Sequence, residues 1–146
     1  MATDGGERLD RILALRREEE QRVRLREAQA LRAAGAARSR LRLLEAQLRS
    51  CRDRRRPGPR GVAPLIDADR CAARLRASLN AQHGAIERAG AALTKARLAL
   101  AQAARRRLAI ERLLAARELT AHGRREAIAQ ADLDDTARLR SLREGS

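Results

Sequence analysis

Cysteine and histidine are the residues through which this chain could hold a metal ion or act as a nucleophile, and it contains few of either. Its two cysteines, Cys51 and Cys71, have no CxxC spacing, and its two histidines, His83 and His122, have no second histidine or cysteine at helical spacing. A zinc site needs three or four such ligands close together, and the sequence also lacks a glycine-rich phosphate loop. The chain is therefore predicted to have no catalytic site, no metal site and no cofactor. We expect a protein that is not an enzyme and has no small-molecule substrate.

The two cysteines lie ten residues to either side of Gly61, so an antiparallel hairpin that turns there brings them level with each other. Two packed helix axes are about 8–10 Å apart, which usually holds facing Cα atoms beyond the roughly 7 Å limit for a disulfide. Free cysteine behaves as a small buried hydrophobic residue. We therefore expect Cys51 and Cys71 to fill the layer nearest the turn as free thiols, with a disulfide as the alternative.

The turn is predicted from the stretch RDRRRPGPRGVAP, which runs from Arg52 to Pro64 and breaks an otherwise helix-forming sequence. Proline inside a helix removes a hydrogen bond and adds strain, and glycine weakens the helix further. The chain is therefore predicted to be all-α, a long two-helix antiparallel coiled-coil hairpin that forms a single domain over residues 1–146. The predicted elements are a first helix over about residues 6–55, capped by Asp4, a turn over about 56–66, and a second helix over about 67–143, capped by Asp67 or Asp69.

A heptad pattern of apolar residues runs through both predicted helices and predicts the seam along which they pair. In the first helix, alternating steps of four and three residues lead from Leu9 to Cys51, and ten of these thirteen positions are apolar. In the second helix the pattern is firm from Ala72 to Ala103 and then blurs, because further leucines add a second stripe. The far half of this helix is therefore expected either to shift the phase of its pattern or to present apolar surface in two directions. The second helix is also the longer one, so we expect its last turns to extend alone and to need a partner.

Composition and charge limit the other classes of partner. The chain has no aromatic residue, 36% of its residues are charged, and its net charge is +14. Such a charge suits a polyanion, but nineteen acidic residues are interspersed with the arginines, and single-stranded nucleic acid is bound on aromatic stacking surfaces. Nucleic acid therefore ranks low as a partner. A basic nucleic-acid-associated helical protein and a structural homo-oligomeric coiled coil are the alternative functions.

The sequence shows neither the pattern of a cleaved signal peptide at its N-terminus nor a run of about eighteen apolar residues. A secreted protein would carry the first of these patterns, and a membrane-spanning protein would carry the second. We therefore expect a protein that is soluble and cytoplasmic, or peripheral at the inner, cytoplasmic face of the membrane, without membrane insertion.

Three segments carry a resemblance to a known family. They are RLDRILALRREEEQ at Arg8–Gln21, RRRLAIERLLAARE at Arg105–Glu118 and EAIAQADLDDTARLR at Glu126–Arg140. In type, order and spacing they are similar to the opening, basic and closing segments of the FliJ and YscO family of type III secretion stalk proteins. The resemblance covers nearly the whole chain. It implies a non-enzymatic component of a flagellar or injectisome export apparatus.

The resemblance also implies partners. In that family the paired termini insert into the hexameric export ATPase as a central stalk, the turn faces the cytoplasmic domain of the export gate, and members escort export chaperones. By this likeness the expected ATPase-binding residues are Leu9, Leu13, Arg117, Arg124, Arg125, Ile128, Leu133, Asp134, Asp135 and Leu139. The expected gate-binding residues are Leu44, Gln47, Cys51, Cys71, Leu75, Ser78 and Gln82.

The expected gate-binding positions differ from the family pattern in one respect. Flagellar members place aromatic residues on the faces near the turn, whereas none of the seven positions here is aromatic. This difference favours the injectisome branch of the family over the flagellar branch.

Overall fold

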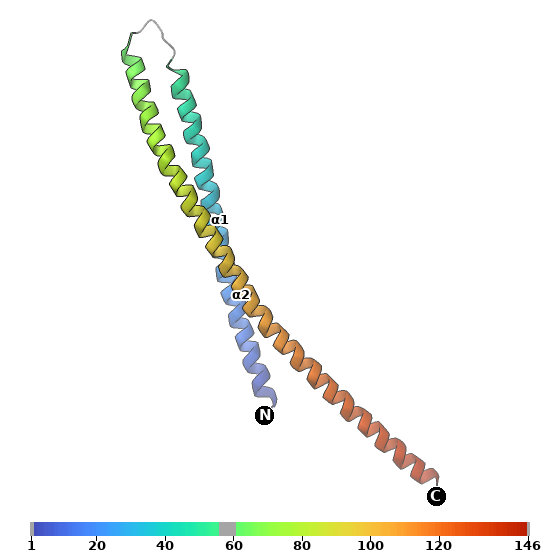
Figure 1. The fold of residues 1–146 in the computed structure, drawn as a ribbon. Helices are drawn as coiled ribbons and strands as arrows, with labels where there is room; N and C mark the ends of the chain where they lie inside the picture. Colours follow the sequence, from blue (N-terminus) through green and yellow to red (C-terminus); the bar gives the residue numbers. More distant parts are fainter. Residues whose placement is uncertain (1, 56–60, 146) are drawn as a thin grey trace. The chain divides into compact units, whose positions relative to one another are not determined.

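The computed structural model describes residues 2–55 and 61–145, and two helices account for nearly all of them. Helix α1 covers Ala2–Asp53 and helix α2 covers Ala63–Glu144. They pair as an antiparallel hairpin (Figure 1), and the residues that the structure describes contain no strand. The predicted all-α hairpin is confirmed. Residues 56–60 of the predicted turn lie outside the described residues.

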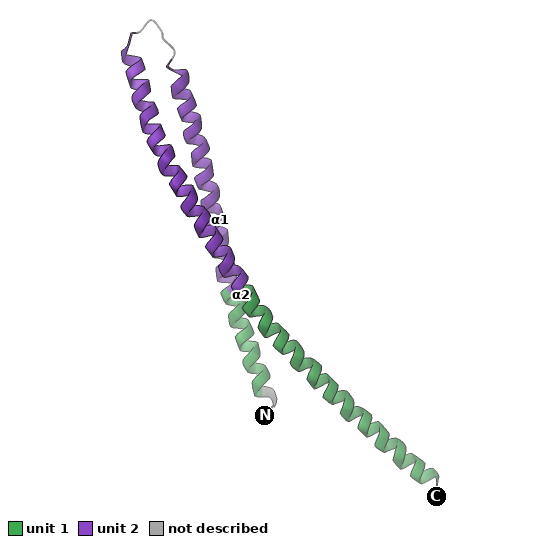
Figure 2. Ribbon diagram, viewed as in Figure 1, with its two compact units in different colours: residues 1–19, 104–146 green, residues 20–103 purple. Residues whose placement is uncertain are grey.

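The chain divides into two compact units, each built from a stretch of both helices (Figure 2). Unit 1 comprises Met1–Glu19 and Ala104–Ser146, and unit 2 comprises Glu20–Ala103. Unit 2 contains the end of α1, the start of α2 and the predicted turn between them. Unit 1 contains the start of α1 and the rest of α2.

The helix ends differ from the predicted ends for reasons that proline and helix-dipole chemistry explain. Helix α1 begins at Ala2, so Asp4 lies in its first turn, where a carboxylate favours the positive end of the dipole, and not at the cap. Helix α2 begins at Ala63, with Pro64 as its second residue. Proline is tolerated there because the amides of a first turn have no partner within the helix. The prediction that all three prolines lie outside a helix is therefore wrong for Pro64.

The chain enters α2 through a glycine in the left-handed region. Gly61 has a φ of 84°, a conformation that glycine adopts without the clash of a Cβ atom. The amide of Leu65 then donates to the carbonyl of Val62 at 3.0 Å. The predicted caps Asp67 and Asp69 lie inside the helix instead, and Oδ1 of Asp69 is 3.4 Å from Nε of Arg55, two residues beyond the end of α1.

The predicted seam of unit 2 is covered along its whole length. Every predicted seam position of α1 from Glu20 to Cys51, and of α2 from Ala72 to Ala103, is buried or half-buried. Contacts between the helices fix an antiparallel register that is nearly symmetrical about Gly61. They join Cys51 to Cys71, Ala37 to Gln82, and Glu27 to Arg97.

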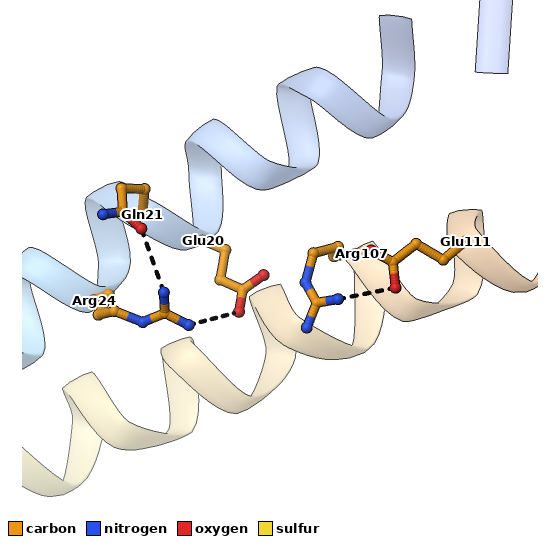
Figure 3. A network of polar contacts seen from close by, with 5 residues as sticks. All are labelled: Glu20, Gln21, Arg24, Arg107 and Glu111. Atoms are coloured by element: carbon orange, nitrogen blue, oxygen red, sulfur yellow. Dashed lines mark hydrogen bonds and ion pairs between the residues drawn. The ribbon is translucent and has the colours of Figure 1, made fainter. Parts of the chain in front are cut away.

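Polar residues interrupt this seam, and each has a partner. Gln82 is buried and donates from Nε2 to the carbonyl oxygen of Ala37 at 2.8 Å. Glu20 is also buried, and it accepts a hydrogen bond at 3.0 Å from Arg24, which donates to Gln21 as well (Figure 3). A buried polar group is tolerated when it is hydrogen-bonded. These partners explain how charged positions fit into a heptad seam.

In unit 1 the seam continues and then stops. Leu9 and Leu13 of α1, and Ile110 and Leu114 of α2, are buried or half-buried. Beyond Leu114, every residue from Ala115 to Gly145 is exposed. The prediction that the last turns of the second helix extend alone is therefore confirmed. The seam remains covered as far as Leu114, eleven residues beyond the point where the sequence pattern blurs.

Candidate functional site

The main candidate site is the uncovered end of α2, Ala115–Gly145, which we call the overhang. At 1.5 Å per residue it is a helix about 45 Å long. Five large apolar side chains project from it with 60–73% of their surface exposed. They are Leu119, Ile128, Leu133, Leu139 and Leu142.

These apolar side chains lie on two opposite sides of the helix. At 3.6 residues per turn, Ile128 and Leu139 follow Leu114 by nearly whole numbers of turns, so they continue the face that packs against α1 earlier in the helix. Leu142 follows Ile128 by fourteen residues, nearly four turns, and borders the same face. Leu119 is nine residues from Ile128, which is two and a half turns, so it lies on the opposite side. Leu133 follows Leu119 by fourteen residues and shares its side. Of the two predicted possibilities, a shift of phase or apolar surface in two directions, the second is observed.

Charge separates the overhang from the rest of the chain. Residues 115–146 contain six arginines and six acidic residues, so their net charge is zero. The whole net charge of +14 therefore lies on residues 1–114. The overhang is therefore neutral overall, whereas residues 1–114 are strongly basic.

A groove of about 840 Å³ opens in unit 1 between the first turns of α1 and the start of the overhang. Leu9 and Asp10 line it from α1, and Leu114, Arg117 and Arg124 line it from α2. Arg117 approaches α1 closely, because a Cβ atom built on Gly5 would lie 2.8 Å from its Nη1. The groove therefore begins where the apolar seam loses its partner helix and has two arginines on its α2 wall.

The structure brings some of the predicted ATPase-binding residues together and separates others. Leu9, Arg117 and Arg124 line the groove, whereas Leu13 is only 8% exposed and packs in the seam. Ile128, Leu133 and Leu139 are distributed along both faces of the overhang. The polar positions lie along the same segment, where Arg125 lines a shallow pocket beside Leu119, Asp134 accepts a hydrogen bond from Gln130 at 3.2 Å, and Asp135 lies 4.0 Å from Arg138.

The sequence reasoning missed one pair on the overhang. His122 Nε2 lies 3.0 Å from Glu126 Oε1, one helical turn away. The four-residue spacing of the two residues was the available signal. Among the described residues no group of three or more potential ligands gathers to hold a metal ion.

Two carboxylates join the helices of unit 1. Glu19 accepts hydrogen bonds from Arg16 at 3.0 Å and from Arg106 of α2 at 2.8 Å. These two guanidinium groups, that of Arg16 first, hold the pKa of the Glu19 carboxyl below its ordinary value. Because Arg106 is engaged in this way, this part of the basic run joins the two helices.

The second carboxylate is on α2. Glu111 accepts a hydrogen bond from Arg107 at 2.9 Å (Figure 3), and Arg17 of α1 lies 3.5 Å from its other oxygen. Arg107, and to a smaller extent Arg17, lower the pKa of the Glu111 carboxyl. The covered part of unit 1 is thus held by ion pairs as well as by its seam.

The predicted gate-binding residues lie in unit 2, near the turn. Four of them, Gln47, Cys51, Cys71 and Leu75, surround a pocket of about 200 Å³ together with Ser50 and Arg54. Ser78 is exposed on α2, whereas Leu44 and Gln82 are buried between the helices. Of the predicted set, Gln47, Ser78 and the rim of the pocket are therefore accessible while the helices stay paired.

The two cysteines are free thiols in direct contact. Cys51 Sγ lies 2.8 Å from Cys71 Sγ, Cys51 is buried, and Cys71 is half-buried. Their predicted place in the layer nearest the turn is confirmed, although they approach more closely than the argument from helix spacing allowed. The hydrogen bond with Cys71, together with burial, raises the pKa of the Cys51 thiol.

The described residues thus form an all-α hairpin protein with a long helix end whose exposed apolar side chains none of the other described residues covers. Residues 5–146 match the family described as flagellar FliJ protein, and the chain belongs to this family. No curated protein and no solved structure matched it. None of the described helices has a stretch long and apolar enough to span a bilayer.

Family membership confirms the resemblance that the sequence carries. It makes the chain a component of the flagellar export apparatus, in a family of structural export proteins that engage other parts of that apparatus. The injectisome branch, which the missing aromatic residues favoured, receives no support from this match.

Proposed function

We propose that the chain is a central stalk of the export apparatus and that the overhang is the segment that enters the hexameric export ATPase. The observation that carries this proposal is the exposure of apolar side chains on two opposite faces of one helix. A helix that is apolar on one face needs one partner surface. A helix that is apolar on two opposite faces can bury both of them inside a ring of subunits, because the ring surrounds the helix.

The groove of unit 1 supports a contact that involves both ends of the chain. Its apolar wall includes Leu9 of α1 and Leu114 of α2, so a helix or loop of the ATPase that enters it touches both helices. Arg117 and Arg124 on the same groove favour an acidic segment at this point. The protein acts here by insertion and positioning, not by catalysis.

We further propose that the turn end of unit 2 meets the cytoplasmic domain of the export gate, through Gln47, Ser78 and the rim of the nearby pocket. The net positive charge of residues 1–114 favours acidic partner surfaces, the export chaperones among them. A stalk that joins a cytoplasmic ATPase to a membrane-bound gate works in the cytoplasm at the inner face of the membrane. The family match and the exposed turn end support these contacts.

The test measures binding of the purified protein to its cognate ATPase, the hexamer content of that ATPase and its rate of ATP hydrolysis. Leu139→Ser is expected to weaken binding at least tenfold, since it removes an apolar contact made only in the complex. The matched control is Leu25→Ser, because both leucines are 60% exposed but Leu25 lies on unit 2. Removing Ala131–Ser146 is expected to abolish the effect on hexamer content and on ATP hydrolysis.

Three results would contradict the proposal. The first is a full-length protein that neither binds the ATPase nor changes its oligomeric state. The second is an equal loss of binding for the Leu139 and Leu25 variants. The third is light scattering that shows stable dimers paired through the overhang, since the partner of the apolar faces would then be a second copy of the chain.

A further inference from the structure

One close contact between the two helices of unit 2 brings together two thiols, whose chemistry the proposed stalk function does not use. The sulfur atoms of Cys51 and Cys71 are 2.8 Å apart, and the chain has no other cysteine. The pair lies in the layer nearest the turn, where α1 ends and α2 begins. Gln47, Leu75 and Arg54 complete the walls of the pocket beside it.

This contact places two thiols where a bond can form with little movement. A disulfide has an S–S length of about 2.05 Å, so the sulfurs must approach by roughly 0.8 Å from their distance in the thiol form. Both are held on helices that already face each other, so bond formation requires no refolding. We propose that Cys51 and Cys71 are a redox-modification site, which forms a reversible intramolecular disulfide that fastens the two helices together at the turn.

The surroundings of the pair fit an exchange with a low-molecular-weight disulfide. Cys71 is half-buried and lines the pocket, whereas Cys51 is only 7% exposed. Cys71 is therefore the thiol that a reagent reaches first. Arg54 places a positive charge on the same pocket, which attracts an anionic reagent such as oxidised glutathione.

The exchange takes place in two steps. Cys71 loses its proton to solvent, and its sulfur attacks one sulfur of the reagent, whose S–S bond breaks to release one thiol. Cys51, deprotonated in its turn, then attacks the Cys71 sulfur of the mixed disulfide, and the second reagent thiol leaves. The two protein thiols have lost two electrons and two protons, and the reagent disulfide has become two thiols.

The bond changes the hairpin by closing a loop of 21 residues that contains the predicted turn. A crosslink of this kind restricts the separated state of the helices and so disfavours opening at the turn end. In a reducing compartment such a bond is transient and reports the redox state. The inference stands apart from the ATPase contact, because it concerns the other end of the hairpin.

The experiment equilibrates the full-length protein with mixtures of reduced and oxidised glutathione and measures the bridged fraction by mass spectrometry of non-reduced digests. We expect a monomer in which the peptides of Cys51 and Cys71 are linked, in a yield that does not change with protein concentration and is reversed by dithiothreitol. A control combines Cys51→Ser with Ser50→Cys, which keeps the loop length nearly constant but moves the thiol about 100° around the helix. The equilibrium constant for bridging is expected to be at least tenfold larger in the natural sequence.

The thermal midpoint provides a second readout. Oxidation is expected to raise the midpoint of thermal unfolding of the natural sequence. In the Cys71→Ser variant, oxidation is expected to leave this midpoint unchanged. Equal bridging constants for the natural sequence and the shifted-thiol control would overturn the proposal. So would products that are only glutathione adducts or intermolecular dimers, or a bridge that forms only after denaturation in urea.

Discussion

Two stretches of α2 have the same kind of sequence and different surroundings. From Ala72 to Ala103, in unit 2, each predicted seam position is covered by α1. From Ala115 to Gly145, in the overhang of unit 1, apolar side chains continue on two sides of the helix, and no other described residue covers them. Apolar positions along a helix thus call for a partner surface, and the length of the other helix decides how far that surface lies within the chain.

Charge strengthens the contrast. Residues 1–114 carry all of the net charge, and the overhang carries none. In the proposed function, long-range attraction acts on the hairpin and short-range apolar contact acts on the overhang. Substitutions should therefore affect the two regions differently.

The largest expected difference concerns leucine. Leu48→Ala should lower the free energy of unfolding by about 2–3 kcal/mol, because Leu48 is buried in unit 2 and its removal leaves a cavity. Leu133→Ala should change it by less than about 0.5 kcal/mol, because Leu133 is 65% exposed on the overhang. Thermal and urea unfolding followed by circular dichroism compare the two variants. Equal losses would mean that the overhang is packed in solution.

A smaller effect is expected at the buried glutamine of the seam. Gln82→Ala removes the hydrogen bond to the Ala37 carbonyl and should destabilise the hairpin by about 1 kcal/mol. Gln130→Ala removes an exposed hydrogen bond to Asp134 on the overhang and should have almost no effect. A Gln82 variant that unfolds at the same urea concentration as the natural sequence would show that this contact does not fix the register.

Glycine offers a change in the stabilising direction. Gly90 and Gly123 both lie inside α2 with open space where a Cβ atom would be. Gly90→Ala should stabilise the paired helices by up to about 1 kcal/mol through helix propensity. Gly123→Ala should increase the helical signal of the overhang and leave the unfolding midpoint of the seam unchanged. A shift of that midpoint by Gly123→Ala would contradict the separation of the two regions.

The smallest expected effect is a dependence on pH. The pKa values of Glu19 and Glu111 are lowered in the folded chain, so both carboxylates stabilise it above the ordinary glutamate pKa, and this contribution is lost as the pH falls through their folded-state values. Combining Glu19→Gln with Glu111→Gln should flatten the fall of the thermal midpoint between pH 6 and about pH 3. Glu118→Gln, on the overhang, is the control and should leave the fall of the thermal midpoint with pH unchanged.

Much of the fold could be predicted because a heptad seam depends on local spacing. All thirteen predicted seam positions of α1 are buried or half-buried, even Glu20, which is charged. The start of α2 could not be predicted in the same way, because a proline such as Pro64 marks either a break or a first turn. The 2.8 Å approach of the cysteines depends on the local distance between two helices, which residue spacing alone does not give.

The candidate site was predictable in outline but not in detail. The excess length of the second helix showed that an end must extend alone, and this required only counting residues. The limit at Leu114 depends on where α1 begins, and α1 begins four residues before its predicted start. The groove beside Leu9 and Arg117 depends on how two particular side chains pack, so the sequence held no signal for it.

Hydrogen exchange of the protein alone and with its cognate export ATPase tests the stalk proposal most directly. Amides of the overhang are expected to exchange rapidly in the free chain, since no packing protects the helix, and more slowly by at least tenfold in the complex. Amides of unit 2 between Glu20 and Ala103 should exchange at the same rate in both. Protection confined to unit 2, with the overhang exchanging equally fast in both samples, would contradict the proposal that the overhang is the ATPase-binding segment.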